Sequence, residues 1–285
     1  MDVRITKCGE LIVCHDDDLL RLCGDPRKVK DVYYEHLPKF LKKMPMHFSK
    51  FSKKDGDDVR FDTTFQTYDR KPNDADSFSL LEDVFKSIPR IVPMSIEVKD
   101  ADSIEACMKI IELIKKYDRF RTTIIGGQYD RTTEKLLEIN PKVCTFFSES
   151  DGIKFLLFYF IGLLPYLKIN REMAALPYMT RDFIKMKYEE RKLTTTTFAY
   201  VFLTFYIYAA QLFNMIANPA LMHLQRRGIC TAYWVINDES EAIHVLKTSK
   251  VQAIMTDNPK KLRHHFIKQF IDDNPNAAGV QKFRE

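Results

Sequence analysis

The chain has 285 residues, of which 45% are hydrophobic, and its formal net charge is +5. This length suits one large domain, and the apolar fraction is high enough to bury a sizeable core, which excludes wholesale disorder. The modest positive charge is compatible with anionic substrates or acidic lipid surfaces. It is far from the dense basic stripe of a nucleic-acid-binding protein, so we expect no nucleic-acid partner.

The chain holds six cysteines, and no two of them have the C-x-x-C spacing of a metal or redox site. Several lie inside apolar, strand-like runs, which indicates free and mostly buried thiols in a reducing compartment. A strand pattern begins directly after Met1, without a signal peptide. Because a domain rarely begins inside a core strand, we expect the true N-terminus to lie upstream.

The first two predicted elements are strands over Asp2–Thr6 and Leu11–His15. The residues between them, KCGE at Lys7–Glu10, have the composition of a tight turn, so we expect an antiparallel hairpin. From about Gly24 to Asp76 the sequence is polar and charged. We expect this stretch to form a long loop with a short helix.

Beyond this loop, strand and helix patterns alternate. Strands are predicted over Ser95–Lys99, Thr122–Gly126, Val143–Phe147, Ala174–Tyr178, Cys230–Ile236 and Ala253–Thr256. Helices are predicted over Leu80–Ile88, Ser103–Tyr117, Tyr129–Ile139, Ala210–Arg226, Asp238–Thr248 and Pro259–Phe270, with Asp238 as an N-cap. This alternation implies parallel strands joined by helical crossovers.

Short strands rich in Val, Ile and Phe at fairly even spacing favour a TIM-type (β/α)8 barrel over an open sheet. The hairpin counted once and the six later strands give seven parallel strands, whereas a closed barrel of this type has eight. We therefore predict an α/β barrel that lacks its first strand. The barrel domain is expected over residues 1–272, with a flexible tail over residues 273–285.

Two segments, Phe155–Leu167 and Phe198–Met222, are unusually apolar. The second has the length of a membrane span, about 20 residues, but it contains polar residues and Pro219. A single pass would also place the last two strands across the membrane from the others. We therefore expect both segments to be membrane-facing insertions that form an interfacial lip or a lid. Basic residues that would meet anionic headgroups are Arg181, Lys185, Lys187, Arg191 and Lys192.

Acidic residues and a histidine fall at predicted strand ends, where barrel enzymes place their catalytic groups. His15 ends the second strand, and Glu97 and Lys99 share one face of a later strand because side chains alternate. Asp2 can face inward in the same way. Inward carboxylates repel one another unless a cation lies between them, and oxygen ligands suit Mg²⁺ or Ca²⁺. Asp257 also ends a strand, but we favour a role in capping the next helix.

Four motifs in chain order resemble those of the glycerophosphodiester phosphodiesterases. They are MDVRITKCGELIVCHDDDLLRLCG at residues 1–24, MSIEVK at 94–99, AYWVIN at 232–237 and AIMTDNPKKL at 253–262. The apolar segments are most similar to the eukaryotic membrane-associated branch of the family, whose members act as lysophospholipases D. The resemblance covers nearly the whole chain and implies metal-dependent hydrolysis of glycerophosphodiesters or lysophospholipids in lipid metabolism.

Carried over residue by residue, the resemblance implies that Asp2 and Glu97 bind a divalent cation, Mg²⁺ or Ca²⁺, and that His15 is the general acid. Lys99 would contact the phosphate. Trp234 would lie at the edge of the substrate pocket, although a core role is equally consistent with the only tryptophan in the sequence. These roles fit the chemistry, because a cation and a lysine offset charge on phosphoryl oxygens and a histidine can protonate an alkoxide.

The sequence also departs from the family pattern. The family's first strand carries His-Arg-Gly followed by Glu-Asn, and nothing in residues 1–285 matches either motif. The glutamate expected two residues before Asp2 would precede Met1. The alternative interpretation is therefore a catalytically inactive, membrane-associated barrel remnant or a truncated gene product. A third interpretation, a phosphoinositide-specific phospholipase C barrel, is disfavoured by the EVK and TDNP motifs. For an active enzyme we expect a membrane-associated, cytosol-facing barrel, with the endoplasmic reticulum as one location.

Overall fold

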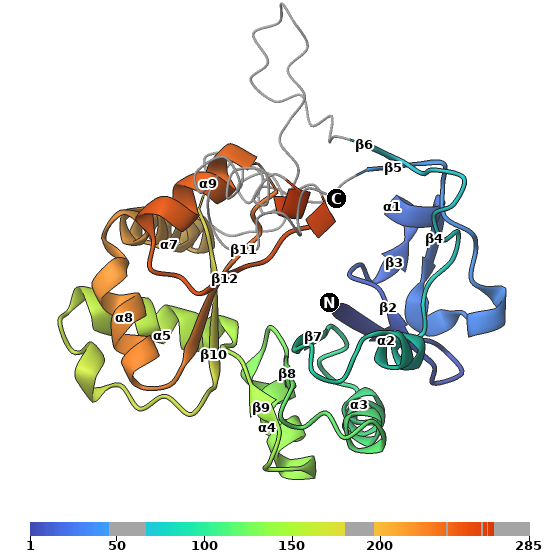
Figure 1. Cartoon of the computed structure of the whole chain (residues 1–285), viewed down its shortest axis with the longest axis horizontal. Coiled ribbons are helices and arrows are strands. Elements are labelled where there is room, and N and C mark those ends of the chain that lie inside the picture. Colours follow the sequence, from blue (N-terminus) through green and yellow to red (C-terminus); the bar gives the residue numbers. More distant parts are fainter. Residues whose placement is uncertain (46–66, 180–196, 238, 258, 261, 265–285) are drawn as a thin grey trace, which may run out of the picture. The chain divides into compact units, whose positions relative to one another are not determined.

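The computed structural model describes residues 1–45, 67–179, 197–237, 239–257, 259–260 and 262–264 (Figure 1). The chain forms two compact units. The first contains the described residues up to Ala174 together with Arg227–Cys230, and the second contains those of Ala175–Arg226 and from Thr231 onward. Several predictions lie outside the described residues: the tail over 273–285, the N-cap Asp238, the basic cluster over 181–192 and the last part of the helix Pro259–Phe270.

The predicted hairpin is confirmed. Strand β1 spans Asp2–Ile5 and pairs antiparallel with β2, which spans Leu11–Val13. The Thr6 amide donates to the Glu10 carbonyl at 2.9 Å across the turn. Gly9 has a φ of +81°, a conformation that residues with a Cβ rarely adopt.

Strand β1 is part of a five-stranded sheet with the order β2-β1-β7-β8-β9. Strands β7 (Met94–Val98), β8 (Thr123–Gly126) and β9 (Cys144–Thr145) pair in parallel, and β1 is parallel to β7. The carboxyl ends of β7, β8 and β9 therefore meet at one edge of the sheet.

Three helices pack against one face of this sheet: α2 (Leu81–Ser87), α3 (Ile104–Lys116) and α4 (Asp130–Ile139). Alternate residues of β1 and β7 point into this core and are at most 9% exposed: Val3, Ile5, Met94, Ile96 and Val98. Burial of one such side chain contributes about 1.5–3 kcal/mol. Because side chains alternate along a strand, this burial fixes the opposite face for the polar residues between them.

The polar stretch after β2 is more ordered than the sequence predicts. β3 (Asp18–Leu19) and α1 (Leu20–Cys23) lie between β2 and this stretch, which itself begins with β4 (Asp25–Lys28) and continues with 3₁₀ helices over Val29–Asp31 and Tyr34–His36. Further on, β5 (Lys43–Pro45) pairs antiparallel with β6 (Thr67–Asp69). A small apolar cluster stabilises this region: Ile12, Cys14, Leu19, Val29, Val32 and Phe78. Residues 46–66 of the stretch lie outside the described part.

The first apolar segment begins within helix α5, which spans Glu149–Phe160, and continues into a 3₁₀ helix over Leu164–Tyr166. The helix begins with a capping box, in which Ser148 accepts a hydrogen bond from the Asp151 amide and the Asp151 carboxylate accepts one from the Ser148 amide. Five large apolar side chains are exposed here: Leu157, Phe160, Ile161, Leu163 and Tyr166.

A three-stranded sheet has the order β10-β11-β12. Its strands span Met173–Pro177, Cys230–Trp234 and Ala253–Ile254, and the last two are parallel. Every strand that the sequence predicts is therefore present, and the α/β class is confirmed. The lack of a first barrel strand stays a prediction.

The single predicted helix over Ala210–Arg226 is wrong. Helix α7 spans Thr197–Ile216 and α8 spans Asn218–Arg226. Pro219 accounts for the break, because proline has no N–H to donate and its ring clashes with the carbonyl four residues earlier. Proline is tolerated in the first turn of the new helix. Helix α9 spans Glu239–Thr248, close to the prediction.

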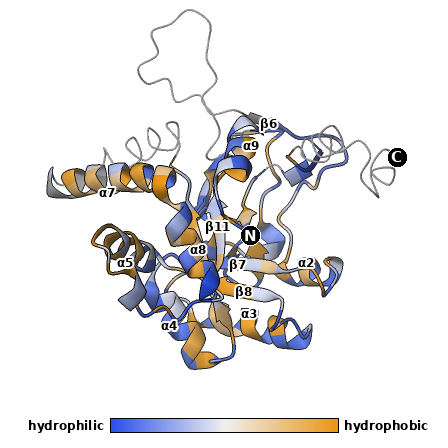
Figure 2. Ribbon diagram, turned by 60° about the vertical axis from the view of Figure 1, so that its left-hand side comes forward, coloured by the Kyte–Doolittle hydropathy of each residue, from blue (hydrophilic) through white to orange (hydrophobic). Residues whose placement is uncertain are grey.

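One face of α7 is apolar and exposed, and Figure 2 shows the helix coloured largely as hydrophobic. Its exposed residues recur at helical spacing and are between 43% and 80% exposed: Val201, Phe202, Phe205, Tyr208, Leu212, Met215 and Ile216. The opposite side is buried through Ile207, Ala210 and Phe213. No helix within the residues that the structure describes combines the length and the apolarity needed to cross a membrane.

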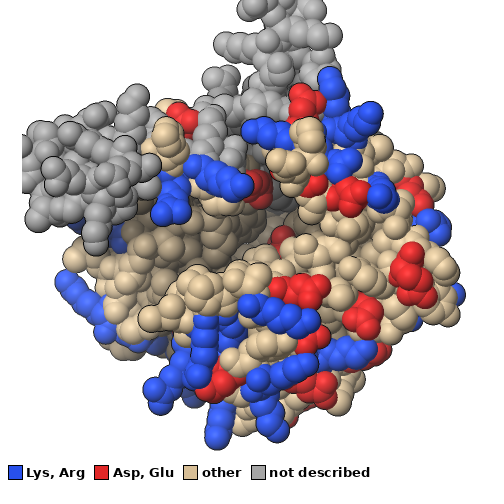
Figure 3. Space-filling model, turned by 45° about the vertical axis from the view of Figure 1, so that its right-hand side comes forward, with Lys and Arg blue, Asp and Glu red and all other residues tan. Residues whose placement is uncertain are grey.

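Charged side chains of both signs are interspersed on the face drawn in Figure 3. Surface ion pairs in the first unit include Lys109 with Glu105 at 2.8 Å and Lys116 with Glu82 at 2.6 Å. Exposed pairs of this kind contribute about 0–1 kcal/mol each. They affect solubility more than the stability of the core.

Candidate active site

The fold brings Asp2 and Glu97 together on one face of the five-stranded sheet. In the parallel pairing of β1 with β7, Asp2 lies opposite Glu97. The Glu97 amide donates to the Met1 carbonyl at 2.9 Å, which fixes this register. The residues that follow them, Val3 and Val98, point into the core. The two predicted ligands therefore lie side by side and away from the core.

Lys99 follows β7 directly and turns its ammonium group toward both carboxylates. Its Nζ is 2.8 Å from Oε1 of Glu97 and 3.5 Å from Oδ1 of Asp2. The Lys99 side chain is 16% exposed, and the Glu97 and Asp2 side chains are 28% and 32% exposed. Two carboxylates therefore share one lysine ammonium group.

The donor set of this cluster fits a hard divalent cation. Mg²⁺ is usually held by one or two carboxylates, with water and substrate phosphate oxygens as its other ligands. Asp2 and Glu97 supply these two carboxylates. Among the described residues, no group of three or more His, Cys, Asp or Glu side chains forms a potential metal site.

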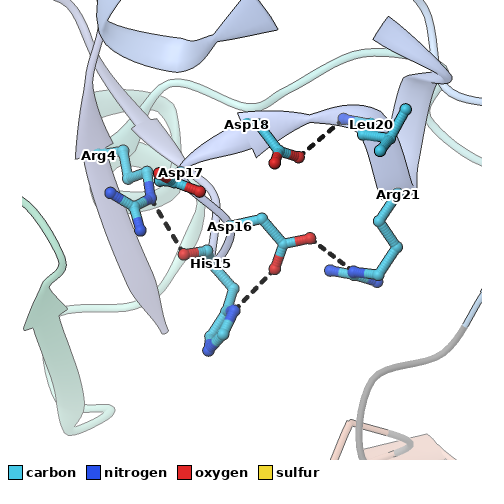
Figure 4. Close-up of a pocket in the computed structure, with 7 residues that line it drawn as sticks. All are labelled: Arg4, His15, Asp16, Asp17, Asp18, Leu20 and Arg21. Carbon is cyan, nitrogen blue, oxygen red and sulfur yellow. Dashed lines mark hydrogen bonds and ion pairs between the residues drawn. The ribbon is translucent and has the colours of Figure 1, made fainter. Parts of the chain in front are cut away.

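His15 belongs to a hydrogen-bonded chain of three side chains, in which Asp16 lies between His15 and Arg21 (Figure 4). Nδ1 of His15 is 2.8 Å from Oδ1 of Asp16, and Nε of Arg21 donates to Oδ2 at 2.6 Å. The His15 side chain is 38% exposed and that of Asp16 is 15% exposed. The imidazole is therefore accessible, while the carboxylate that holds it is shielded.

Asp16 is ionised at physiological pH. Burial alone would raise the pKa of its carboxyl group, but hydrogen bonds from His15 and Arg21 outweigh burial and hold the pKa well below its usual range. Burial raises the pKa of the neighbouring Cys14 thiol to about 12, so this thiol stays neutral. The permanent negative charge beside His15 is therefore that of Asp16.

Arg4 connects the two groups of candidate residues. Its Nε donates to the His15 carbonyl at 3.0 Å, and its Nη1 donates to Oδ1 of Asp100 at 2.9 Å. The other oxygen of Asp100 accepts a hydrogen bond from the Ile5 amide at 2.7 Å. Because Asp100 follows Lys99, Arg4 links the backbone of the histidine to the end of the strand that carries Glu97.

An open pocket of about 470 Å³ lies beside His15 and Asp16 in the first unit. It is lined by Arg4, His15, Asp16, Asp17, Asp18, Leu20 and Arg21 (Figure 4). Asp17 pairs with Lys28 at 3.2 Å, and Asp18 accepts a hydrogen bond from the Leu20 amide at 3.0 Å. Both therefore have structural contacts, and the imidazole of His15 is the lining group best suited to exchange a proton near neutral pH.

Trp234 belongs to the second unit. Its indole N–H donates to the Ala175 carbonyl at 3.3 Å. In the same unit, Nδ2 of Asn237 donates to the Asp257 carboxylate at 2.8 Å, and Oδ1 of Asn237 accepts from the Asp257 amide at 2.8 Å. Asp257 thus links the ends of two strands, beyond the capping role that we predicted for it. The pocket role of Trp234 stays a prediction.

The sequence interpretation missed Arg4, Arg21 and Asp100. Arg4 carried a signal that could have been used, since it stands two residues after Asp2 and must share its face of the strand. Asp100 adjoins Lys99, but its partner is distant in the sequence. Arg21 contacts Asp16 only because the short helix α1 turns the chain back, which no periodic pattern indicates.

Comparisons with known proteins point in one direction. The profile of the "Glycerophosphoryl diester phosphodiesterase family" matches residues 1–261. Human lysophospholipase D GDPD1 is 29% identical over 270 residues, which are 93% of this chain and 76% of that protein. Human lysophospholipase D GDPD3 is 27% identical over 267 residues, or 93% of this chain and 74% of that protein.

Solved structures agree at the level of fold. The glycerophosphodiester phosphodiesterase of Thermotoga maritima superposes with a TM-score of 0.51 at 17% identity, covering 94% of this chain and 83% of its own. The enzyme of the same name from Agrobacterium tumefaciens gives a TM-score of 0.51 at 14% identity, with coverage of 92% and 84%. The fold shared with these proteins is of the TIM-barrel type.

Proposed function

Since the chain belongs to the glycerophosphoryl diester phosphodiesterase family, we propose that it hydrolyses a glycerophosphodiester or a lysophospholipid at the site formed by Asp2, His15, Glu97 and Lys99. Members of this family are phosphoric diester hydrolases, and the chain is assigned to the same class of enzyme. The observation that carries the proposal is the juxtaposition of Asp2, Glu97 and Lys99 at the end of β7.

Each group has a distinct task in the proposed reaction. Nδ1–H of His15 donates to Asp16, so the proton that is transferred is the one that the protonated ring carries on Nε2. When the P–O bond breaks, its electron pair stays on the departing oxygen, and that oxygen takes the proton from His15. Lys99 supplies positive charge toward the non-bridging phosphate oxygens. The oxygen of one water molecule forms the new bond to phosphorus, and the proton that this water loses restores the protonated ring of His15, so that the products are a phosphomonoester and an alcohol.

A divalent cation, Mg²⁺ or Ca²⁺, is part of the proposal. Asp2 and Glu97 would hold it, and it would supply Lewis-acid stabilisation of charge on the phosphate. Lys99 contacts both carboxylates, so the lysine and the cation would neutralise the same pair of negative charges. Their combined charge suits a substrate whose phosphodiester is itself an anion.

We further propose that the substrate is a lysophospholipid taken from a membrane surface. Helix α7 has no charged residue, and its exposed face is apolar through Phe205, Tyr208, Leu212 and Met215. Aromatic and apolar side chains of this kind insert into the headgroup and acyl boundary of a bilayer. Basic residues precede the helix in the sequence and would attract anionic lipids. The six free cysteines support a location that faces the reducing cytosol. We propose the cytosolic side of the endoplasmic reticulum membrane as one such location.

The proposal is tested by incubating the purified protein with lysophosphatidylcholine or glycerophosphocholine, with Mg²⁺, with Ca²⁺ and with a chelator. We expect release of choline that depends on the cation and is abolished in H15A. Choline release that persists in H15A, or that is unaffected by the chelator, would contradict the assigned roles.

A second candidate is an inactive barrel that binds the substrate without cleaving it. The observation that favours it is that residues 1–285 contain no His-Arg-Gly or Glu-Asn motif. The same assay separates the two functions. Saturable binding of glycerophosphocholine without choline release under every cation condition would support the inactive barrel.

A further inference from the structure

We infer that Arg21 is a positioning residue for the general acid and that it acts on His15 through Asp16. This inference rests on the proposed function, because it assigns a task to Arg21 within the same site. His15, Asp16 and Arg21 all belong to the motif at residues 1–24, and the fold brings the arginine against the aspartate.

The first observation is the division of the Asp16 carboxylate between two partners. Oδ1 accepts from Nδ1 of His15 at 2.8 Å, while Oδ2 accepts from Nε of Arg21 at 2.6 Å. A carboxylate held at both oxygens cannot rotate about its χ2 angle without breaking a charge-assisted bond. Arg21 therefore fixes the plane of the group that in turn fixes the imidazole.

The second observation is that Arg21 is itself anchored. Its Nη1 donates to the carbonyl of Pro45 in β5 at 2.9 Å. Its helix, α1, begins where the Leu20 amide bonds to Asp18 and ends at Gly24, which has a φ of +75°. The guanidinium group is thus held from two directions, and a planar fork of donors loses little freedom when it binds.

The third observation concerns charge. Asp16 is 15% exposed and Arg21 is 26% exposed, so each would carry a desolvation cost if its partner were removed. The other charged groups lining the pocket have partners of their own. Arg4 pairs with Asp100 at 2.9 Å and Asp17 pairs with Lys28 at 3.2 Å.

The chemical consequence follows from these contacts. A hydrogen bond at Nδ1 selects the tautomer and the orientation in which Nε2 exchanges the proton. Partners that orient a functional histidine in this way are typically worth about 10–100-fold in activity when removed. Loss of Arg21 leaves the His15 and Asp16 side chains in place but frees the carboxylate to turn.

The test compares two substrates that differ in their need for an acid. Lysophosphatidylcholine releases an alkoxide, which must be protonated, whereas the p-nitrophenyl diester of glycerol phosphate releases a weakly basic phenolate. We expect R21A to lose about 10–100-fold in kcat with the first substrate and less than about 3-fold with the second. The R21K variant is expected to retain more activity than R21A with the alkoxide substrate.

R27A is the matched control. Arg27 is close in sequence and 53% exposed, and it pairs with Asp25 through Nη2 to Oδ2 at 2.6 Å and Nε to Oδ1 at 3.1 Å. We expect the R27A variant to have the kcat of the wild type with both substrates. Equal losses of R21A with the two substrates would indicate a general structural defect and would overturn the inference.

A second measurement does not depend on turnover. The ¹⁵N NMR signals of the His15 ring, assigned by comparison with H15A, report which nitrogen carries the proton. In the neutral form of the ring, we expect the proton to lie on Nδ1 in the wild type and in R27A. In R21A we expect a mixture of the Nδ1–H and Nε2–H tautomers. An unchanged ring signal in R21A would refute the positioning role even if neither substrate is hydrolysed, so failure of this inference is distinguishable from failure of the proposed function.

Discussion

Asp2 lies opposite Glu97 across two parallel strands, although β2 and the long segment after it separate these residues in the sequence. The pairing holds two like charges close together, and burial of the alternate residues on the other face prevents either strand from turning them away. Lys99 offsets part of the repulsion. The fold thereby holds two carboxylates and one ammonium group together.

Replacing Glu97 by Gln is expected to weaken divalent-cation binding, because the amide keeps the size of the side chain but removes its charge. We expect the Kd for Mn²⁺, measured by isothermal titration calorimetry, to rise about 10-fold or more, which corresponds to about 1.4 kcal/mol. E105Q removes the carboxylate that pairs with Lys109 on the surface of α3 and should bind as wild type. An unchanged affinity in E97Q would rule out Glu97 as a ligand.

The contribution of Asp16 to stability is expected to depend on pH. Its pKa is lower in the folded protein than in the unfolded chain. The stabilisation is therefore complete above the unfolded pKa of about 4 and is lost as the pH falls toward the folded value. Urea unfolding should show D16N less stable than wild type at pH 7, with a difference that shrinks below about pH 4.

D83N is the control for this experiment, because it removes an exposed carboxylate that pairs with Lys86. Its stability should differ from that of wild type by no more than about 0.5 kcal/mol. A stability difference for D16N that stays constant from pH 7 to pH 3 would mean that the ionised form of Asp16 is not the stabilising one.

The exposed face of α7 is expected to bind lipid vesicles. Phe205 and Met215 are 72% and 80% exposed on that face, and the double variant F205S/M215S should lose about 10-fold or more in binding. Co-sedimentation with vesicles of phosphatidylcholine and phosphatidylserine measures the change. L246S, which alters an exposed apolar residue of α9, should bind as wild type. Equal binding by all three proteins would exclude this face of α7 as the contact.

Gly126 and Gly152 are expected to respond in opposite ways to alanine. A Cβ at Gly126 would lie 3.0–3.1 Å from the ring of Phe146, which is 7% exposed. Overpacking of this kind costs about 1–3 kcal/mol. A Cβ at Gly152, within α5, would meet no atom within 4 Å, and G152A should gain about 0.5–1 kcal/mol in helix stability. The free energies of unfolding of G126A and G152A, measured with urea, test both expectations. A stable G126A would show that the Phe146 ring can move.

The strands could be predicted from the sequence because their evidence is local. In β7 and the residue after it, Ile96 and Val98 alternate with Glu97 and Lys99, so one short stretch contains both the buried face and the polar face. The predicted proximity of Asp2 and Glu97 needed one further assumption, parallel pairing, which the alternation of strands and helices supplies.

The remaining features depend on contacts that alternation does not encode. The break between α7 and α8 is caused by Pro219, whose effect on backbone geometry outweighs an apolar pattern that continues through it. The contact of Arg21 with Asp16 requires α1 to reverse the chain, and that of Arg4 with Asp100 joins distant segments. Hydrogen bonds of this kind form only in the folded chain, so they cannot be predicted from composition or periodicity.

The bridge from Arg4 to Asp100 also has an evolutionary consequence. It joins the His15 backbone to the residue after Lys99, so these two contacts help to fix the spacing of His15 and Lys99. That intervening chain contains the 3₁₀ helices and the β5–β6 pair. Changes of length or sequence in that chain would leave the Arg4–Asp100 bridge in place, but they would preserve the contacts of Arg21 only where they spare α1 and Pro45.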